Sequence, residues 1–255
     1  MMTMTMAGAL KTKWQKGDAA INGWLAIPCG FSAELMARQG WDSLTVDMQH
    51  GLVDYASAVQ MLTAIATTKT VPLVRVPWLE EGIIMKMLDA GAAGIICPMI
   101  NNRADAERLV CAARYPPRGR RSFGPLRARL CYGEDYHLRA NDEVVILAMV
   151  ETAEAVQNLD DILSVEGLDA IYVGPSDLSF SIGCKPTFDQ TEEEPVRLIN
   201  RIITAAKKHK VIAGIHNGTP AYARAMIKLG YQFVTISSDS RLLASGAAKI
   251  IGEMK

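Results

Sequence analysis

The sequence predicts an α/β protein folded as a (β/α)8 TIM barrel, and three observations favour this prediction. Short apolar segments recur eight times, with segments of helical periodicity between them. Most of these segments are almost continuously apolar, as is typical of parallel strands buried on both faces. The length of 255 residues is typical of one such barrel. We therefore expect a single domain over residues 1–255, in which residues 1–20 form an N-terminal extension or a first helix.

Each expected strand is a short run of apolar and β-branched residues that ends at a turn or a polar residue. The eight strands are expected at Gly23–Pro28, Ser43–His50, Val71–Pro77, Gly94–Ile100, Val144–Glu151, Ala170–Asp177, Val211–Asn217 and Phe233–Asp239.

Eight helices are expected in alternation with these strands. Ser32 is a candidate N-cap, and AGAAG (90–94) and LGY (229–231) end helices on glycine. Eight strands alternating with eight helices indicate a closed barrel. An open, doubly wound sheet is the alternative, disfavoured because no GxGxxG follows the first strand. The helices are expected at Ser32–Gln39, Asp54–Ala66, Ile83–Ala90, Arg103–Ala113, Ala153–Ser164, Pro195–His209, Thr219–Leu229 and Arg241–Met254.

The segment Tyr115–Asn141 interrupts this alternation and is rich in Pro, Gly and Arg. A long excursion that follows a strand of a barrel usually shapes the active site or an interface. We expect one of these roles for this segment.

The composition disfavours several classes of function. Lys plus Arg and Asp plus Glu number 27 each, so no basic field favours binding to nucleic acid or a membrane surface. No apolar run reaches the roughly 18 residues of a membrane span, and the N-terminal segment lacks the apolar core of a signal peptide. We therefore expect a cytoplasmic protein. The five scattered cysteines form no CxxC pair, which disfavours a disulfide framework or a zinc cluster.

Charged or titratable side chains gather at the expected carboxyl ends of six strands, where barrel enzymes carry their chemistry. Such side chains are rarely buried without a partner, because desolvation is costly. Their placement therefore indicates an active site. They are Asp47, His50, Arg75, Glu151, Asp177, His216 and Asp239.

Glu151 and Asp177 end neighbouring strands and predict a metal site. Two carboxylates with open positions beside them suit Mg²⁺ or Mn²⁺. Glu151 could instead cap a helix, since ETAEA has the pattern of a helix start. No lysine lies on any expected strand, which disfavours a Schiff base and favours a metal ion as the electrophile.

Arg75 lies in an otherwise apolar strand and needs an anionic partner. It could stabilise a developing enolate oxygen or form a structural salt bridge. His50 is a candidate general base, with a structural histidine as the alternative. Asp89 could orient His50 or lie at the surface. The run Gly174–Asp177 could present N–H groups to a carboxylate or phosphate, although turns use the same residues.

Several long segments resemble the HpcH/HpaI family of class II pyruvate aldolases, which includes 4-hydroxy-2-oxoheptanedioate aldolase and 2-dehydro-3-deoxyglucarate aldolase. The resemblance extends in order over nearly the whole chain from Gly23 on. The matching segments are GWLAIP, SAELMARQGWDSLTVDMQH, VPLVRVPW, MLDAGAAGIICPMINN, ARYPPRGRRSFGP, VETAEAVQNLDDILSVEGLDAIYVGPSDLS and VTISSDSRLLASGA.

The resemblance implies a modified barrel whose last helix packs on a neighbouring subunit, and a hexamer built as a trimer of such dimers. It implies a divalent metal ion, Mg²⁺ or Mn²⁺ with Co²⁺ or Zn²⁺ as further candidates, and no organic cofactor. The implied substrates are a 2-oxoacid and an aldehyde, in the catabolism of aromatic compounds or sugar acids.

The resemblance also implies roles for particular residues. The metal-binding residues of the family fall on Glu151 and Asp177, and its catalytic arginine falls on Arg75. Its histidine–aspartate dyad falls on His50 and Asp89. The remaining implied positions are a further active-site aspartate at Asp47, a tryptophan at Trp24, and a backbone segment that holds the pyruvate carboxylate at Gly174, Pro175, Ser176 and Asp177.

Three positions depart from the family pattern. Met149 stands where the family usually has glutamine, two residues before the metal-binding glutamate. Gln49 stands where glutamate is frequent. His216 replaces an apolar residue that faces the aldehyde. We expect Met149 and His216 to contact the substrates and to alter the choice of partner substrate more than the reaction.

We therefore expect a metal-dependent class II aldolase that reversibly cleaves a 4-hydroxy-2-oxoacid to pyruvate and an aldehyde through a metal-stabilised pyruvate enolate. Two alternatives keep the fold and the metal: an acyl-CoA lyase of the citramalyl type and an oxaloacetate decarboxylase. A non-catalytic ketoacid-binding protein is a third, disfavoured by the set of strand-end charges. A CoA substrate would need a basic groove, for which the candidates are Arg118, Arg120, Arg121, Arg127 and Arg129.

Overall fold

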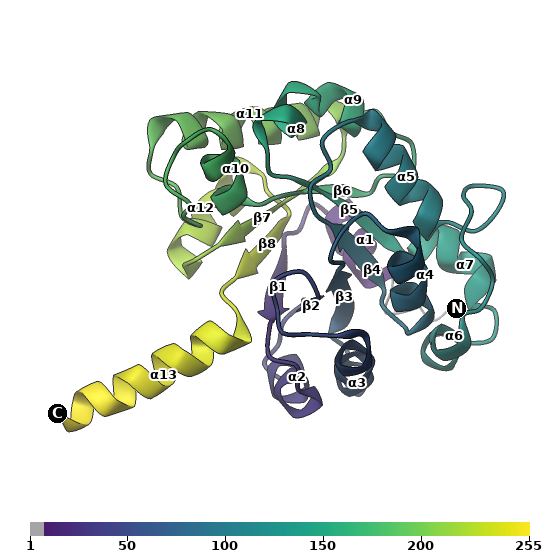
Figure 1. Ribbon diagram of the computed structural model, residues 1–255, viewed down its shortest axis with the longest axis horizontal. Helices are drawn as coiled ribbons and strands as arrows, with labels where there is room; N and C mark the ends of the chain where they lie inside the picture. Colours follow the sequence, from purple (N-terminus) through teal and green to yellow (C-terminus); the bar gives the residue numbers. More distant parts are fainter. Residues whose placement is uncertain (1–7) are drawn as a thin grey trace.

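The computed structural model describes residues 8–255, which form a closed barrel of eight parallel strands in the order β1 to β8 (Figure 1). β1 pairs with both β2 and β8, so the sheet closes on itself. This confirms the predicted (β/α)8 barrel. The expectation of an N-terminal extension or first helix falls partly on residues 1–7, outside the described residues; within the rest, Ala9–Gln15 forms helix α1.

Most strands end earlier than the sequence pattern predicts. The expected strand Ala170–Asp177 ends at Val173, because Pro175 has no N–H to donate to a ladder and begins a helix instead. Asp177 was expected at a strand end, but it lies in the first turn of a helix. The strands are β1 Ala20–Leu25, β2 Ser43–Asp47, β3 Val71–Arg75, β4 Gly94–Cys97, β5 Val145–Val150, β6 Ala170–Val173, β7 Ile212–Asn217 and β8 Phe233–Ile236.

The helices lie outside the barrel, with small differences from the predicted ranges. The expected helix Ala153–Ser164 is divided at Asn158 into two short helices. Ser32 is not an N-cap, because α2 begins after Cys29 and the Ser32 hydroxyl donates to Asp239 instead. The helices that alternate with the strands are α2 Gly30–Ala37, α3 Tyr55–Ile65, α4 Glu81–Asp89, α5 Arg103–Ala113, α8 Ala153–Gln157, α9 Leu159–Leu163, α10 Pro175–Ser181, α11 Glu193–His209, α12 Pro220–Leu229 and α13 Asp239–Met254.

The excursion Tyr115–Asn141 contains two helices that the sequence pattern did not predict, α6 Leu126–Tyr132 and α7 Tyr136–Glu143. It follows helix α5 and not a strand, so it starts at the amino end of the barrel, opposite the carboxyl ends of the strands. Its side chains hold α4 in place, since Arg127 donates to the Ala90 carbonyl and Tyr132 to the Gly91 carbonyl. This position disfavours a role in the active site of its own chain, and a role at an interface stays a prediction.

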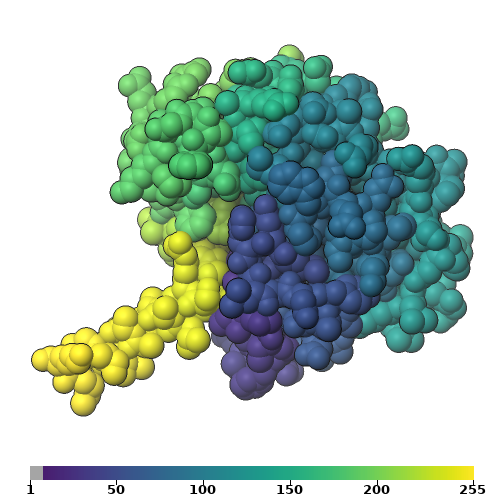
Figure 2. Space-filling model, viewed as in Figure 1, coloured from purple at the N-terminus to yellow at the C-terminus, as the bar shows by residue number. Residues whose placement is uncertain are grey.

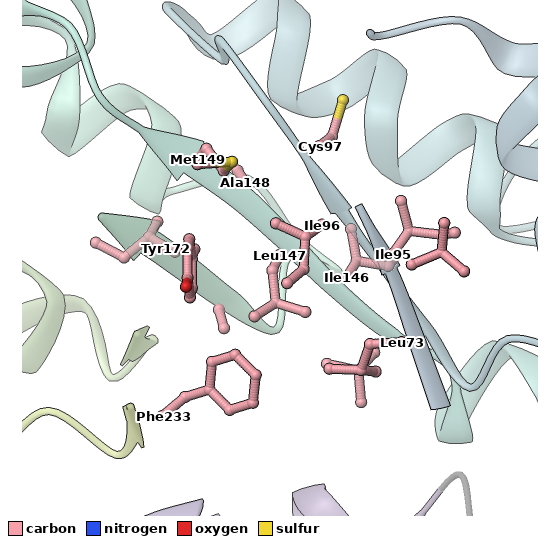
Figure 3. Packing of buried hydrophobic residues seen from close by; sticks show 14 of the residues in the cluster. Leu73, Ile95, Ile96, Cys97, Ile146, Leu147, Ala148, Met149, Tyr172 and Phe233 are labelled. Atoms are coloured by element: carbon pink, nitrogen blue, oxygen red, sulfur yellow. The ribbon is translucent and has the colours of Figure 1, made fainter. Parts of the chain in front are cut away.

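Side chains alternate between the inside of the barrel and the layer of helices around it. Leu147, Tyr172 and Phe233 point into the barrel, whereas Cys97 points toward the helices (Figure 3). The interior also contains a polar layer of Asn22, Ser43, Thr45 and Thr235, all fully buried and hydrogen-bonded to one another. The bonds within this layer join Asn22 to each of the other three residues.

The last helix, α13, extends away from the barrel (Figures 1 and 2). Within α13, Asp239 is the buried residue, and its carboxylate accepts hydrogen bonds from the backbone N–H groups of Ala26 and Ile27. The start of α13 is therefore fixed to the end of β1. Large apolar side chains farther along the helix are exposed, namely Leu242, Leu243, Ile250, Ile251 and Met254. Within residues 8–255, no helix has the length and apolarity needed to cross a bilayer.

Arg114, which follows α5, carries a buried charge that ties the helix layer to the barrel. Its guanidinium donates to the carbonyls of Val144 and Gly167 at 2.8 and 3.0 Å, and to the Asp169 carboxylate at 2.9 Å. The side chain is 1% exposed. A buried guanidinium with these partners joins the amino ends of β5 and β6 to α5.

We expect Arg114→Met to lower the free energy of unfolding by about 3 kcal/mol, because two buried carbonyls lose their donor and Asp169 keeps only Lys11 and the N–H of Ile146. Urea unfolding followed by circular dichroism measures this change. Arg197→Met, in an exposed ion pair with Glu194 on α11, is the matched control and should change stability little. Equal effects of the two substitutions would contradict this role of Arg114.

Candidate active site

A cavity of about 440 Å³ opens at the carboxyl ends of the strands. Its walls come from β1, β2, β3, β5, β6 and β7 and the segments that follow them, and from the segment after β8. It does not include Glu151, Asp89 or Asp239, the last of which binds the backbone after β1. The predicted site residues that line it are Trp24, Asp47, His50, Arg75, Met149, Gly174, Pro175, Ser176, Asp177 and His216.

Arg75 and Asp47 form a buried ion pair at the base of this cavity. The Arg75 Nε and Nη2 atoms donate to the two Asp47 oxygens at 2.8 and 2.7 Å. Asp47 also accepts hydrogen bonds from Trp24 Nε1 and from the backbone N–H of His50. Burial alone would raise the pKa of Asp47, but the bonds and charge of Arg75 outweigh it and lower the pKa below its usual value. The carboxylate therefore stays ionised and fixes the guanidinium.

The pairing with Asp47 leaves part of Arg75 free for a substrate. Two of its three nitrogens are used, whereas Nη1 has no hydrogen-bond partner within residues 8–255. The guanidinium carbon lies 4.8 Å from the ring centroid of Trp24, a cation–π contact that further limits its movement. Both roles predicted for Arg75 are thus compatible with its position, since it forms a salt bridge and still presents a donor to the cavity.

Glu151 lies just behind the wall of the cavity and is 2% exposed. Its Oε1 atom accepts a hydrogen bond from the backbone N–H of Met99 at 2.8 Å. Met99 has a φ of 56°, in the left-handed region, so the chain adopts an uncommon conformation where it meets the carboxylate. Burial and the nearby charge of Asp177 raise the pKa of Glu151 to about 7. A cation beside the two carboxylates would offset both effects.

Gly174 leaves the space that the second oxygen of Glu151 occupies. A Cβ atom at this position would lie 2.4 Å from Glu151 Oε2, closer than any real contact of this kind. Gly174 is the N-cap of α10, Pro175 is its first residue, and Asp177 lies exposed in the first turn. Because proline has no N–H, Ser176 and Asp177 are the first residues of α10 that can offer backbone N–H groups to a ligand.

The structure does not bring His50 and Asp89 together within the described chain. His50 is exposed at the rim of the cavity. Asp89 is the last residue of α4, which runs antiparallel to the strands and ends near the opposite side of the barrel. There the Asp89 carboxylate pairs with Arg121 at 2.6 Å. His50 thus borders the cavity, whereas Asp89 of the same chain is not placed to orient it.

His216 is enclosed by aromatic rings on the side of the cavity formed by β6 and β7. Its ring centroid lies 5.0 Å from Trp24 and 4.5 Å from Phe188, and its Nδ1 atom is 3.0 Å from the hydroxyl of Tyr172. Burial, followed by the positive charges of Arg75 and Arg241, lowers the pKa of His216 to about 3, against the opposing effect of Asp47. The ring is therefore neutral at physiological pH.

Five residues that line the cavity were not predicted: the small residues Ala26 and Ser238, and the larger Tyr172, Phe188 and Arg241. Tyr172 lies on β6, two residues before Gly174, which follows the strand. The alternation of strand side chains could therefore have placed Tyr172 on the same face as Gly174. Arg241 lies two residues after Asp239, and its guanidinium lies 4.7 Å from the ring of Phe188. Phe188 belongs to the irregular segment between α10 and α11, for which the sequence offers no periodic signal.

The oxygen donors of Glu151 and Asp177 fit a hard divalent cation. Within the described residues, no group of three or more His, Cys, Asp or Glu side chains could hold a metal ion. Two carboxylates alone suit Mg²⁺ or Mn²⁺, which retain several positions for water and substrate oxygens. Glu151 lies too deep for water to stabilise its charge fully, which favours a positive ion nearby. The residues present therefore fit the predicted metal.

Comparison with known proteins agrees with this architecture. The family model described as HpcH/HpaI aldolase/citrate lyase matches residues 24–246. A hydroxypyruvate/pyruvate aldolase from Rhizorhabdus wittichii is 41% identical over 246 residues, which cover 96% of this chain and 98% of the relative. A 4-hydroxy-2-oxo-heptane-1,7-dioate aldolase from Salmonella dublin is 36% identical, with coverage of 95% and 92%.

Solved structures match along nearly the whole chain. An HpcH/HpaI aldolase/citrate lyase family protein from Burkholderia cenocepacia J2315 has a TM-score of 0.90 at 30% identity, covering 97% of this chain and 99% of that one. The citrate lyase beta subunit from M. tuberculosis, solved with oxaloacetate and magnesium, has a TM-score of 0.57 at 13% identity, covering 93% and 95%. This second likeness shows the fold alone.

We expect Gly174→Ala to weaken Mn²⁺ binding at least tenfold, because the new methyl group would displace the Glu151 carboxylate. Titration calorimetry with Mn²⁺ measures the affinity without any need for turnover. Gly82→Ala, in helix α4, is the matched control, since a Cβ there makes only an ordinary contact of 3.7 Å with Glu80 Oε1. Unchanged Mn²⁺ affinity in Gly174→Ala would show that Glu151 is not a ligand or can move without cost.

We also expect the unfolding of the chain to be accompanied by proton uptake at His216 when the pH is acidic. The pKa of His216 is about 3 in the folded chain and near 6.5 in the unfolded chain, so the unfolded chain binds more protons between these values. The stability that the neutral ring contributes is complete above about pH 6.5 and is lost as the pH falls toward 3. Unfolding at pH 5 should therefore take up about one more proton in the native chain than in His216→Phe. Parallel curves of unfolding free energy against pH for the two chains would rule this out.

Proposed function

Because this chain belongs to the HpcH/HpaI family of aldolases, we propose that it is a metal-dependent class II aldolase that reversibly cleaves a 4-hydroxy-2-oxoacid to an aldehyde and pyruvate or hydroxypyruvate. Membership of the family makes it a carbon–carbon lyase. The observation that carries the finer proposal is one cavity lined by Asp177 and by Arg75 with its free Nη1, with the Glu151 carboxylate just behind the wall at Gly174.

Glu151 and Asp177 would hold the divalent metal ion, for which Mg²⁺ and Mn²⁺ are the first candidates. When bound there, the ion supplies Lewis acidity that polarises the 2-oxo group of the oxoacid and favours loss of a C3 proton. The backbone N–H groups of Ser176 and Asp177, in the first turn of α10, would bind the carboxylate of the oxoacid.

Arg75 donates through Nη1 to the 2-oxo oxygen and binds it more tightly as negative charge develops there. Asp47 keeps the guanidinium in position through its two hydrogen bonds, so little reorganisation is needed during the reaction. His50 lies at the cavity rim and accepts or returns the proton that moves between the oxoacid and the aldehyde oxygen. Asp89 of the same chain lies too far away for the implied dyad.

The aldehyde is proposed to bind between Trp24, Met149 and His216. Met149 is 2% exposed and presents a thioether at the position where the family resemblance implies glutamine. It lies beside Tyr172 in the register of β5 and β6. This side of the cavity is therefore aromatic and largely apolar, with His216 as a polar group next to it.

The acyl-CoA alternative needs free arginine side chains to bind the phosphates of CoA, and the candidate arginines are not free. Each of them already has a partner, and the excursion that carries them starts at the amino end of the barrel. The pairs are Arg118 with Asp142, Arg120 with Glu81, Arg121 with Asp89 and Arg129 with Glu134, while Arg127 donates to the carbonyl of Ala90.

We further propose that α13 packs on a neighbouring subunit in a hexamer built as a trimer of dimers. The support is that α13 extends away from its own barrel with exposed leucine, isoleucine and methionine side chains (Figure 2). Sedimentation equilibrium measures the mass of the assembly. A monomer at micromolar concentration would contradict the proposal.

The activity is tested by metal-dependent release of pyruvate from 4-hydroxy-2-oxoacids, with EDTA-treated protein as the control. Oxaloacetate and a citramalyl-CoA substrate are measured beside them. Cleavage of a hydroxy-oxoacid that EDTA abolishes supports the aldolase. Faster turnover of oxaloacetate or of the CoA ester would replace the proposal with one of the two alternatives, and no turnover after metal loading would favour a binding protein.

We expect Arg75→Ala to lower both aldol cleavage and the exchange of pyruvate methyl protons with D₂O by roughly 100-fold, because both need the same enolate. Exchange is followed by proton NMR. Arg75→Lys keeps the charge but lacks the paired geometry with Asp47, so it should restore only part of the rate. Normal exchange in Arg75→Ala would show that Arg75 does not act on the enolate.

A further inference from the structure

We propose that His216 is a hydrogen-bond acceptor with a fixed tautomer, and that it selects substrates with a hydroxyl group on a carbon next to the reacting carbonyl. This inference rests on the proposed aldolase function and adds a specificity-determining residue to it. It is carried by a chain of hydrogen bonds that runs from the polar layer inside the barrel to the cavity.

The chain begins at Asn22, whose orientation its neighbours determine. The hydroxyls of Ser43 and Thr45 both donate to Asn22 Oδ1, at 2.8 and 3.2 Å. In this arrangement the amide oxygen faces β2, which carries both hydroxyls, and the amide nitrogen faces β8. There Asn22 Nδ2 donates to Thr235 Oγ1 at 2.9 Å.

Tyr172 transmits this orientation to the cavity. Its hydroxyl is fully buried and donates to Thr235 Oγ1 at 2.7 Å. A phenol has one proton, so the same hydroxyl can only accept from its second neighbour, His216 Nδ1, at 3.0 Å. His216 must then carry its proton on Nδ1.

The second nitrogen of His216 is consequently an acceptor. A neutral imidazole has one N–H group, and Nδ1 uses it, so Nε2 has a free lone pair. Burial and the charge of Arg75 keep the ring neutral. Within residues 8–255, Nε2 has no hydrogen-bond partner. It is also not sealed off from solvent, unlike the buried polar atoms that lack a partner. Because His216 lines the cavity, Nε2 is open to a ligand.

The aromatic neighbours of His216 prevent the ring from turning away. Trp24 meets it edge-on, and Phe188 covers it at 4.5 Å. Phe188 is fixed in turn by Asp189, whose carboxylate accepts hydrogen bonds from the Gly218 N–H and the Thr219 hydroxyl, both at 2.7 Å. The acceptor is therefore held at one place in an otherwise aromatic wall, where a hydroxyl group is favoured over a methyl group.

The hydroxyl group has two possible sources in an aldol reaction. It could belong to a 2-hydroxyaldehyde, such as glycolaldehyde, or to C3 of a hydroxylated oxoacid, such as hydroxypyruvate. Two pairs of matched substrates separate these sources. Glycolaldehyde is compared with propionaldehyde when pyruvate is the partner, and hydroxypyruvate is compared with pyruvate when propionaldehyde is the partner.

For the native chain we expect a preference, in kcat/KM, for the hydroxylated member of one of the two pairs. His216→Phe keeps an aromatic ring and should reduce this preference about tenfold, the effect of one neutral hydrogen bond. His209→Phe, at a histidine on α11 that pairs with Asp160, is the matched control and should keep the native preference. An unchanged preference in His216→Phe would overturn the proposal.

A second variant tests the tautomer and not only the presence of a ring. Thr235→Val removes the acceptor of Tyr172, so the phenol should donate to His216 Nδ1 and the proton should move to Nε2. Methoxyacetaldehyde, which can accept but not donate at that position, should then improve relative to propionaldehyde. Nitrogen-15 NMR should place the proton on Nδ1 in the native chain and on Nε2 in Thr235→Val. A native proton on Nε2 would refute the proposal.

Exchange of pyruvate methyl protons with D₂O, measured without an aldehyde, separates the two levels of the argument. If the native chain with metal shows no exchange, the proposed aldolase function fails whatever His216 does. If exchange occurs but the substrate preferences do not depend on His216, the inference alone fails.

Discussion

The buried pair of Arg75 and Asp47 sets the conditions for the whole cavity. An arginine inside a barrel mouth is stable there only because a carboxylate meets it in two hydrogen bonds. The same carboxylate fixes Trp24 and the backbone before His50. The positive charge of Arg75 also acts on the neighbouring groups, since it opposes protonation of His216 and favours the ionised form of Glu151. Loss of either partner would therefore change the chemistry of residues on several strands.

The polar layer beneath this pair explains why the barrel interior is not wholly apolar. Asn22 and Thr235 are completely buried, and each satisfies several hydrogen bonds with its neighbours. Such a network is stabilising only when every member has a partner, and it then allows one arrangement of donors and acceptors. Because of this property, the nitrogen of His216 that carries the proton can be inferred from buried residues that contact no substrate.

Much of the fold could be predicted from the sequence, because eight apolar runs with helical segments between them admit few architectures. The two helices of the excursion, α6 and α7, could not be predicted, because its Pro-, Gly- and Arg-rich composition indicates a loop. Its start at the amino end of the barrel did follow from the predicted helix Arg103–Ala113 that precedes it. The strands were also predicted to be too long at their carboxyl ends. Residues such as Asp177 follow the apolar run directly, although the hydrogen bonds of the sheet have already ended.

The candidate site was predictable to the extent that its residues lie at strand ends. Arg75, Asp47 and His216 were found in this way. Phe188 was not, because it reaches the cavity from an irregular segment whose position depends on Asp189 and on the β7–α12 turn. Asp89 was expected to orient His50 from its place at a helix end and from the resemblance, but in the folded chain its carboxylate is bound to Arg121.

The two halves of the cavity differ in what they are made of. On the side of Glu151, the decisive groups are a backbone N–H at Met99 and the missing side chain of Gly174. On the side of His216, they are the side chains themselves. Mutation exchanges side chains readily but alters backbone groups only by moving the chain. Descendants of this protein, natural or selected in the laboratory, can therefore acquire new partner substrates through single substitutions while the bond-making half is inherited unchanged.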